Sequence, residues 1–385
     1  MTVTTPNGFR AAGATAGLKA SGRPDVALVV NDGPAHNAAG VFTANRVQAA
    51  PVVWSRQVVA DGRIDAVVLN SGGANACTGP TGFQNTHATA ERVATTLGLS
   101  ATDVAVCSTG LIGTQLPMDL LLPGVAAAAA ALGGEEKHGT DAATAIMTTD
   151  TVIKTAIGTG DGWSIGAMAK GAAMLAPGLA TMLVVLTTDA DVAPDDLDGA
   201  LREACRTTFE RVDSDGCMST NDTVLLLASA ASGRSPTQAE FQEVLTGVCA
   251  DLARQLLADA EGAAHDIAVT VTSAATETDA VEVARAVARS NLFKCAVFGR
   301  DPNWGRVLAA VGTTTAAFDP QTLDVTMNGV AVCRDGAVGD DPAKVDLTGR
   351  DVDVLIDLKA GAATATVWTS DLTHDYVHEN SAYST

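Results

Sequence analysis

Short runs of β-branched and aliphatic residues, each ending in turn-forming residues, place the strongest constraint on how this chain folds. The first third contains three of them, at 25–30, 65–70 and 103–110. Helical patterns follow the second and third runs, at 86–99 and 124–134. Because strands that alternate with helices bury their apolar faces against neighbouring layers, this order predicts an α/β fold.

The middle of the chain changes to strands joined by turns and then to helices. The expected strands are 148–158, 162–171 and 181–188. The expected helices are 194–212, 236–261 and 279–293. The second of these helices has Ser235 as its expected N-cap and Pro236 at its first position. Glu261 is expected to close it, where a carboxylate faces the negative end of the helix dipole.

The last part of the chain has the pattern of hairpins. Asn328-Gly329, flanked by strand residues, is typical of a type I′ turn. Residues 351–358 alternate polar and apolar, which predicts a strand with one solvated face. His374 and His378 lie four apart, a helical metal spacing, but their context is strand-like and no third ligand is evident. We therefore expect no zinc site there.

Two further polar stretches resemble ligand loops without matching them. Residues 213–222 have the acidic character of a calcium loop but not the spacing of the twelve-residue motif. Residues 70–79 are Gly-rich after a strand, yet they carry neither the dinucleotide nor the P-loop spacing. We expect no metal and no organic cofactor.

The net charge and the cysteine pattern limit the partners and the cellular compartment that we expect for this protein. The formal net charge of -20 would be repelled by nucleic acid and by anionic membranes, so we expect neither as a partner. No apolar stretch approaches the ~20 residues of a membrane span, and the start lacks a basic segment followed by an apolar one. The seven cysteines form no C-x-x-C pair. These features favour a reducing compartment, and we expect the protein in the cytoplasm.

The position of Thr181, between a turn and a strand, gives the most specific chemical hypothesis. A Pro177-Gly178 turn precedes it, and an apolar strand follows it. A threonine hydroxyl is a weak nucleophile that needs a base, and one solution is the residue's own α-amino group. An internal residue has that amine only after the peptide bond before it is cut. Judged from this pattern alone, the commoner interpretation of Thr181 is a threonine that only begins a strand.

A set of motifs distributed along nearly the whole chain supports the hypothesis that Thr181 is a nucleophile. It comprises "AKGAAMLAPGLATMLVVLTTDA", "CSTGLIG", "IMTTDT", "DAEGAA", "DPNWGR" and "ENSAYST". Together and in this order they resemble the glutamate N-acetyltransferase/ornithine acetyltransferase family, the self-processing threonine enzymes of arginine biosynthesis. The resemblance implies a layered helix-sheet-sheet-helix sandwich of the N-terminal-nucleophile-like type, in two lobes.

The resemblance also implies where the chain is cut. The family cleaves between Ala and Thr of its "LATML" segment, which here is Ala180–Thr181. The products would be an N-terminal fragment, 1–180, carrying the oxyanion hole, and a C-terminal fragment, 181–385, beginning with the nucleophile. The family assembles as dimers of cleaved pairs, so we expect an α2β2 heterotetramer.

Further site residues follow from the same motifs. The oxyanion hole of the family carries over onto Thr109 and Gly110, in the turn after a strand, where backbone and hydroxyl donors can converge. The expected substrate contacts are Thr148, Lys170, Thr181, Glu261, Asn380 and Thr385. Which threonine of 148–151 meets the substrate stays open, with Thr148 preferred.

The implied reaction moves an acetyl group from N2-acetyl-L-ornithine to L-glutamate through an acetyl-threonine intermediate, without a cofactor. One alternative is a bifunctional enzyme that also accepts acetyl-CoA as a second acetyl donor. Another is an aminopeptidase of related fold with the same kind of nucleophile. A third, of a different class, is a ligand-binding protein that is never cleaved and catalyses nothing.

Overall fold

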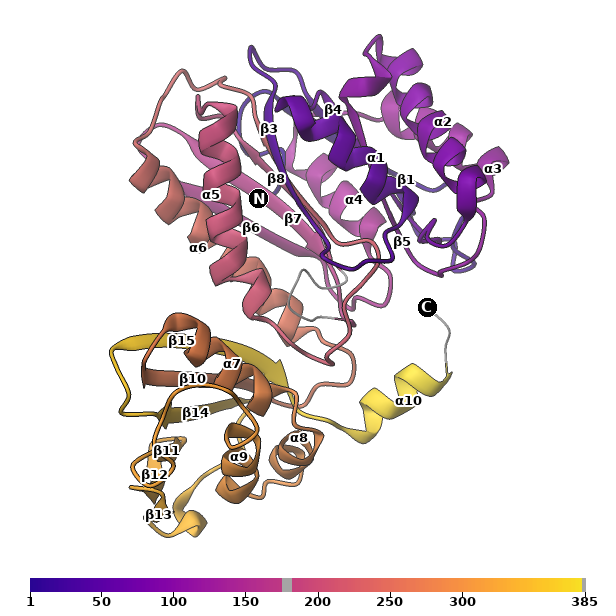
Figure 1. The fold of residues 1–385 in the computed structure, drawn as a ribbon. Helices are drawn as coiled ribbons and strands as arrows, with labels where there is room; N and C mark the ends of the chain where they lie inside the picture. Colours follow the sequence, from indigo (N-terminus) through magenta and orange to yellow (C-terminus); the bar gives the residue numbers. More distant parts are fainter. Residues whose placement is uncertain (175–181, 383–385) are drawn as a thin grey trace.

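The computed structural model describes residues 1–174 and 182–382. Within them the elements form two lobes (Figure 1). The first lobe holds β1 to β9 and α1 to α6, and the second holds β10 to β15 and α7 to α9. The first lobe is a helix-sheet-sheet-helix sandwich, which confirms the fold that the resemblance implies.

One sheet of the sandwich has four strands in the order β1-β2-β4-β5. Their bounds are β1 (Phe9–Ala14), β2 (Val26–Asn31), β4 (Ala66–Ser71) and β5 (Val104–Thr109). Every residue of β2, β4 and β5 is buried, as expected of strands covered on both faces. The edge strand β5 is protected by α1 (Ala50–Val58), since Ser55 Oγ bonds both the N–H and the C=O of Val106.

The other sheet has five strands in the order β3-β9-β8-β7-β6. Their bounds are β3 (Asn37–Phe42), β6 (Lys154–Thr159), β7 (Ser164–Lys170), β8 (Leu183–Thr188) and β9 (Thr223–Ala228). The inner faces of the two sheets share one apolar cluster, and α4 (Glu136–Ile146) packs into it with small residues. The outer faces are covered by α2 (Gly79–Leu97) and α3 (Met118–Ala130) on one side and by α5 (Pro194–Thr207) and α6 (Gln238–Ala258) on the other.

Strand β8 lies in the middle of its sheet, parallel to β9 and antiparallel to β7. The predicted cut at Ala180–Thr181 falls just before this strand, in the part of the chain outside the described residues. Fragment 181–385 would supply β8 and β9, while β3, β6 and β7 would come from fragment 1–180. Two strand pairings, β3 with β9 and β7 with β8, would thus join the fragments. The fragments are a different division from the lobes, whose boundary falls between α6 and β10.

The second lobe is a six-stranded sheet with helices on one face. Its elements are β10 (Asp266–Ala274), α7 (Glu277–Ala288), α8 (Asn291–Phe298), α9 (Trp304–Val311), β11 (Asp324–Met327), β12 (Val330–Arg334), β13 (Ala337–Val338), β14 (Asp351–Asp357) and β15 (Ala363–Ser370). Asn328 and Gly329 both have positive φ between β11 and β12, as the predicted hairpin turn requires. Buried and exposed residues alternate along β14, as predicted.

Several local predictions were wrong, among them the expected strand 148–158, which begins only at Lys154 as β6. The segment with His374 and His378 is a helix, α10 (His374–Ala382), which returns from the second lobe towards the first (Figure 1). Helix α6 begins after Thr237, whose hydroxyl accepts from the Glu240 N–H in a capping box, and not after Ser235. It ends at Ala258, so Glu261 lies in the following turn rather than in the last helical turn. Within the described residues, no helix is long and apolar enough to cross a membrane.

Candidate active site

A small cavity of about 60 Å³ lies between the two sheets of the first lobe, where β5 and β7 end. Its lining includes five residues predicted from the sequence, Thr109, Gly110, Thr148, Lys170 and Glu261. A larger cavity of about 980 Å³ adjoins it and shares Gly110, Thr148, Thr149 and Glu261 with it. Asn380 lines only the larger one. Ala180, Thr181 and Thr385 lie outside the described residues.

Thr109 and Lys170 are the last residues of their strands, one from each sheet. The Lys170 Nζ donates a hydrogen bond of 3.2 Å to the Thr109 Oγ1. Because an ammonium can only donate, the Thr109 oxygen accepts here and its own hydrogen is left to donate elsewhere. The contact therefore leaves the Thr109 hydroxyl free to donate a hydrogen bond, with the Lys170 ammonium next to its oxygen.

The backbone at Gly110 requires glycine. Its φ is 131°, and a Cβ there would lie 2.5 Å from the Gly73 nitrogen. The N–H groups of Gly72 and Gly73 both donate to the Thr109 carbonyl, at 2.9 and 3.0 Å. The Gly-rich stretch 70–79 thus packs against the Thr109-Gly110 turn and shapes it.

Charged groups are unusually buried around this cavity. The side chains of Lys154 and Asp150 are fully inaccessible, and the Lys154 Nζ lies 2.7 Å from Asp150 and 2.5 Å from Asp259. Asp150 also accepts from the N–H groups of Thr148 and Gly171, at 2.9 and 2.7 Å. The ion pair thereby fixes two backbone segments that border the cavity.

The pKa values reflect this burial. Burial alone would raise the pKa of Asp150, but Lys170, Lys154 and hydrogen bonds lower it to about 2. Burial lowers the pKa of Lys170 below its ordinary value, and Asp150 opposes that shift. For Asp222, burial raises the pKa well above the ordinary range.

Sequence reasoning missed a polar segment that ends at Asp222. Ser219, Thr220 and Asn221 line the cavity, and the Asn221 amide donates to Ser108 O at 2.8 Å and to Ala74 O at 2.6 Å. This amide links the two sheets next to the Thr109-Gly110 turn. The only sequence signal is the polar run "STND" just before β9. Its place at the site depends on the parallel pairing of β8 and β9, which sets their entrances side by side.

The chain on both sides of residues 175–181 borders this region. Met174 lines the small cavity. On the other side, the Met182 N–H donates to the Asp222 Oδ1 at 3.1 Å. The second carboxylate oxygen of Asp222 is buried and has no hydrogen-bond partner among the described residues.

The remaining predicted residues lie at the rim. The Asn380 amide donates to the Glu261 carboxylate at 3.0 Å, so α10 meets the turn after α6. Thr149 lines the same two cavities as Thr148, whereas the Thr151 hydroxyl bonds Asp259. Across residues 1–174 and 182–382, no three His, Cys, Asp or Glu side chains lie together as a metal site would need.

Comparison with known proteins adds independent evidence. The model of the ArgJ family matches residues 10–385. The arginine biosynthesis bifunctional protein ArgJ of Streptomyces avermitilis is 66% identical, with full coverage of both chains. The protein of that name from Thermobifida fusca is 63% identical with the same coverage, and that from Mycobacterium tuberculosis is 57% identical over 99% of this chain and 96% of its own.

Two solved structures are also similar to this chain in sequence. Ornithine acetyltransferase from Mycobacterium tuberculosis, complexed with ornithine, is 57% identical with a TM-score of 0.45, covering 47% of this chain and 96% of that one. The arginine biosynthesis bifunctional protein ArgJ of Bacillus halodurans is 34% identical with a TM-score of 0.49, covering 51% and 97%. The family match and the identity over the full chain show that this protein belongs to the ArgJ family, the acetyltransferases of arginine biosynthesis.

Proposed function

We propose that this protein cleaves itself between Ala180 and Thr181 and then transfers acetyl groups from N2-acetyl-L-ornithine to L-glutamate in the cytoplasm. One observation carries the proposal. The Thr109-Gly110 turn and Lys170 meet in one cavity, bordered by the chain on both sides of the segment that contains Thr181. Membership of the ArgJ family supports the same reaction class.

The chemistry needs only side chains and one new chain end. The Thr181 hydroxyl attacks the acetyl carbonyl carbon, and its proton passes to the α-amino group of the same residue. That amine has a pKa of about 8 in a free chain, so at neutral pH an appreciable fraction is unprotonated. The tetrahedral intermediate collapses, the C–N bond breaks, and ornithine leaves with the proton on its amine.

The second half of the reaction repeats the first in reverse. An acetyl ester on Thr181 remains, and the amine of L-glutamate attacks it. The C–O bond breaks, the Thr181 oxygen regains a proton, and N-acetyl-L-glutamate leaves. In both halves the negative charge develops on the carbonyl oxygen, which Thr109 and Gly110 would stabilise with pre-positioned donors.

The larger cavity suits a cationic substrate side chain. Among the described residues four carboxylates line it, Asp259, Glu261, Asp375 and Glu379, against the amine of Lys19, and Asp259 is already paired with Lys154. Burial lowers the pKa of Lys19 to about 8, so at neutral pH it keeps most of its charge, and the carboxylates still outnumber it. The ammonium of ornithine would be attracted to this lining, where Thr148 and Asn380 complete the proposed contacts. Thr385, also proposed as a contact, lies outside the described residues.

Replacing Thr109 with Ala is expected to reduce kcat by roughly tenfold to a thousandfold, the upper part of which is the ~10²–10³-fold loss typical of one missing oxyanion donor. Thr109→Ser keeps a hydroxyl within reach of Lys170 and is the matched control, expected within about tenfold of the parent. Steady-state kinetics on the cleaved protein would measure both. Equal kcat for Thr109→Ala and the parent would remove Thr109 from the mechanism.

Lys170→Met is expected to lower kcat more than it raises KM. A lysine that only contacted the substrate, as the sequence predicts, would mainly affect KM. The contact between Lys170 and Thr109 changes this expectation, since loss of the ammonium removes positive charge beside the developing oxyanion. The exposed Lys137 provides the control, Lys137→Met. A raised KM at unchanged kcat would return Lys170 to a purely substrate-binding role.

The pH profile gives an independent readout of Lys170. Its pKa lies below the ordinary value, so its charge is present at low pH and is lost as pH rises through the lowered pKa. The activity of the parent should therefore fall on the alkaline side at a pH below about 10.4, the ordinary lysine value. In Lys170→Met this alkaline decline should be absent, and in Lys137→Met it should be unchanged.

Intact-mass measurement of the purified protein tests the proposal as a whole. The expected result is two species, 1–180 and 181–385, with an added acetyl group on the second after incubation with N2-acetyl-L-ornithine. The strand pairings in the five-stranded sheet would keep the fragments together, and we propose an α2β2 assembly. One intact chain without an acetyl adduct would favour a ligand-binding protein instead, and release of amines from peptide amides would favour an aminopeptidase.

The second acetyl donor is a separate question. Close relatives are named bifunctional proteins, which favours an additional acetyl-CoA-dependent activity as the alternative. Formation of N-acetylglutamate with acetyl-CoA as the sole donor would establish it. Activity only with N2-acetyl-L-ornithine would restrict this protein to the transfer reaction.

A further inference from the structure

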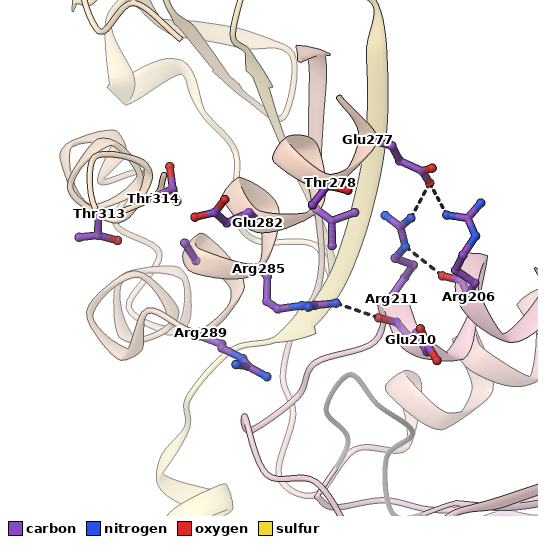
Figure 2. Close-up of a pocket in the computed structure, with 12 residues that line it drawn as sticks. Arg206, Glu210, Arg211, Glu277, Thr278, Glu282, Arg285, Arg289, Thr313 and Thr314 are labelled. Carbon is purple, nitrogen blue, oxygen red and sulfur yellow. Dashed lines mark hydrogen bonds and ion pairs between the residues drawn. The ribbon is translucent and has the colours of Figure 1, made fainter. Parts of the chain in front are cut away.

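A second large cavity, of about 540 Å³, lies where the two lobes meet (Figure 2). The first lobe supplies the end of α5 and the short 3-10 helix η3 (Phe209–Arg211), and the second supplies α7 and the turn after α9. This interlobe cavity shares no lining residue with the two cavities of the active site. It is therefore a separate place for a ligand.

Arginine side chains from both lobes converge on the interlobe cavity, and three of them have acidic partners. Glu277 accepts from Arg206 at 2.8 Å and from Arg211 at 2.6 Å. Arg289 donates to Asp213 at 2.6 Å. The charges of these three guanidinium groups are thus compensated within the protein.

Arg285, the fourth, differs from the others. Its only described hydrogen bond goes to the main-chain carbonyl of Glu210, at 3.4 Å, as Figure 2 shows. Its Nε is buried and has no partner among the described residues. Burial lowers the pKa of Arg285, and the neighbouring charge of Arg289 acts in the same direction. An arginine stays protonated in proteins, so this side chain is a cation without a bound carboxylate.

Acidic groups lie on the same cavity. The Glu210 carboxylate has no hydrogen-bond donor among the described residues, and Glu282 accepts from the backbone and hydroxyl of Thr315. When the outside acids that pair with Arg289 and Arg206 are included, namely Asp213 and Glu203, five acids face four arginines, so the arginines of the cavity carry no net positive excess. In a chain of net charge -20 there is no local excess of positive charge to hold a polyanion.

We propose that the interlobe cavity binds a small zwitterion, of the chemical class of a free α-amino acid. Its carboxylate would form the missing ion pair with Arg285 through the two terminal Nη groups, since the Nε is inaccessible from the cavity. Its ammonium would face Glu210, whose carboxylate has no donor among the described residues, and its side chain would lie against Val281 and Ala286. Because the lining comes from both lobes, the bound molecule would hold them together.

Three molecules with the same carbon chain test this proposal by calorimetric titration, namely L-norleucine, hexanoate and hexylamine, with sulfate as the polyanion. We expect L-norleucine to bind saturably and at least tenfold more tightly than hexanoate, and hexylamine and sulfate not to bind at this site. Binding should be lost in Arg285→Gln, weakened about tenfold in Arg285→Lys, and unchanged in Arg92→Gln, a control on the distant helix α2. The difference between the parent and Arg285→Gln isolates this site from the active site.

Each contrary result overturns a defined part of the proposal. Identical titrations for the parent and Arg285→Gln would show that Arg285 does not bind the ligand. Hexanoate binding as tightly as L-norleucine would show that the acids do not contribute to binding. Tighter, Arg285-dependent binding of sulfate would show that the cavity binds polyanions instead of zwitterions. A crystal of the unaltered protein soaked in L-selenomethionine avoids any dependence on how the variants fold. An anomalous peak beside Arg285 is expected, and its absence at saturating concentration would overturn the site.

Discussion

Thr181→Ala is expected to leave the protein as a single chain of 38.9 kDa with no acetyltransferase activity. Without the hydroxyl, nothing attacks the preceding carbonyl, so the peptide bond between Ala180 and residue 181 stays intact. The α-amino group that would serve as the base is then never formed. One substitution therefore removes both the nucleophile and the proton acceptor, and the loss should reach the detection limit of the assay.

The control for this experiment is Thr181→Ser. Serine retains the hydroxyl and, once cleaved, the amine, so it should still split and retain measurable transfer. A denaturing gel, intact mass and acetyl transfer from N2-acetyl-L-ornithine would be measured on the same samples. A Thr181→Ala protein that splits at this bond, or an unsplit protein with normal turnover, would contradict the proposed nucleophile.

Much of the fold could be predicted because its strands are buried on both faces. Such strands appear in the sequence as continuous β-branched runs, and β2, β4 and β5 lie within a residue or two of the predicted runs. The boundaries of helices were harder to predict, because several residues can act as caps. Ser290, for example, accepts from the Phe293 N–H and divides the expected helix 279–293 into α7 and α8.

The site could be predicted only in part, for a topological reason. Thr109, Lys170 and Glu261 were identified through motifs, but their proximity depends on how two sheets face each other. Asn221 and Asp222 carry no motif, and only the parallel pairing of β8 with β9 brings them beside Met182. Nothing in the local sequence indicates which strands pair.

Arg285 illustrates the same limit for a surface site. In the sequence it is one arginine on an amphipathic helix, where a solvated charge is the ordinary interpretation. Its Nε is buried without a partner among the described residues, and Glu277 and Asp213 are bonded to other arginines. An unpaired cation of this kind arises from long-range packing and is invisible to residue patterns.

Lys154→Met is expected to destabilise the protein by about 3–5 kcal/mol, the usual result of removing one member of a buried ion pair. Methionine fills most of the space but leaves Asp150 and Asp259 facing each other without their shared cation. The free energy of unfolding would be measured from urea titrations at pH 7. Lys137→Met removes an exposed lysine and should change it by less than about 1 kcal/mol.

The pH dependence distinguishes charge from packing as the cause. In the parent, the pKa of Asp150 is about 2, so its stabilising effect is complete above its unfolded value of about 3.9 and is lost as pH falls towards 2. Without Lys154 that pKa must rise, because the largest remaining influence is burial. Protonation of Asp150 would then remove its unpaired negative charge. The difference in unfolding free energy between the parent and Lys154→Met should therefore shrink between pH 7 and about pH 4. A deficit that stays constant over this range would instead attribute it to lost packing around Lys154, and the ion pair would no longer explain how Thr148 and Gly171 are held at the active site.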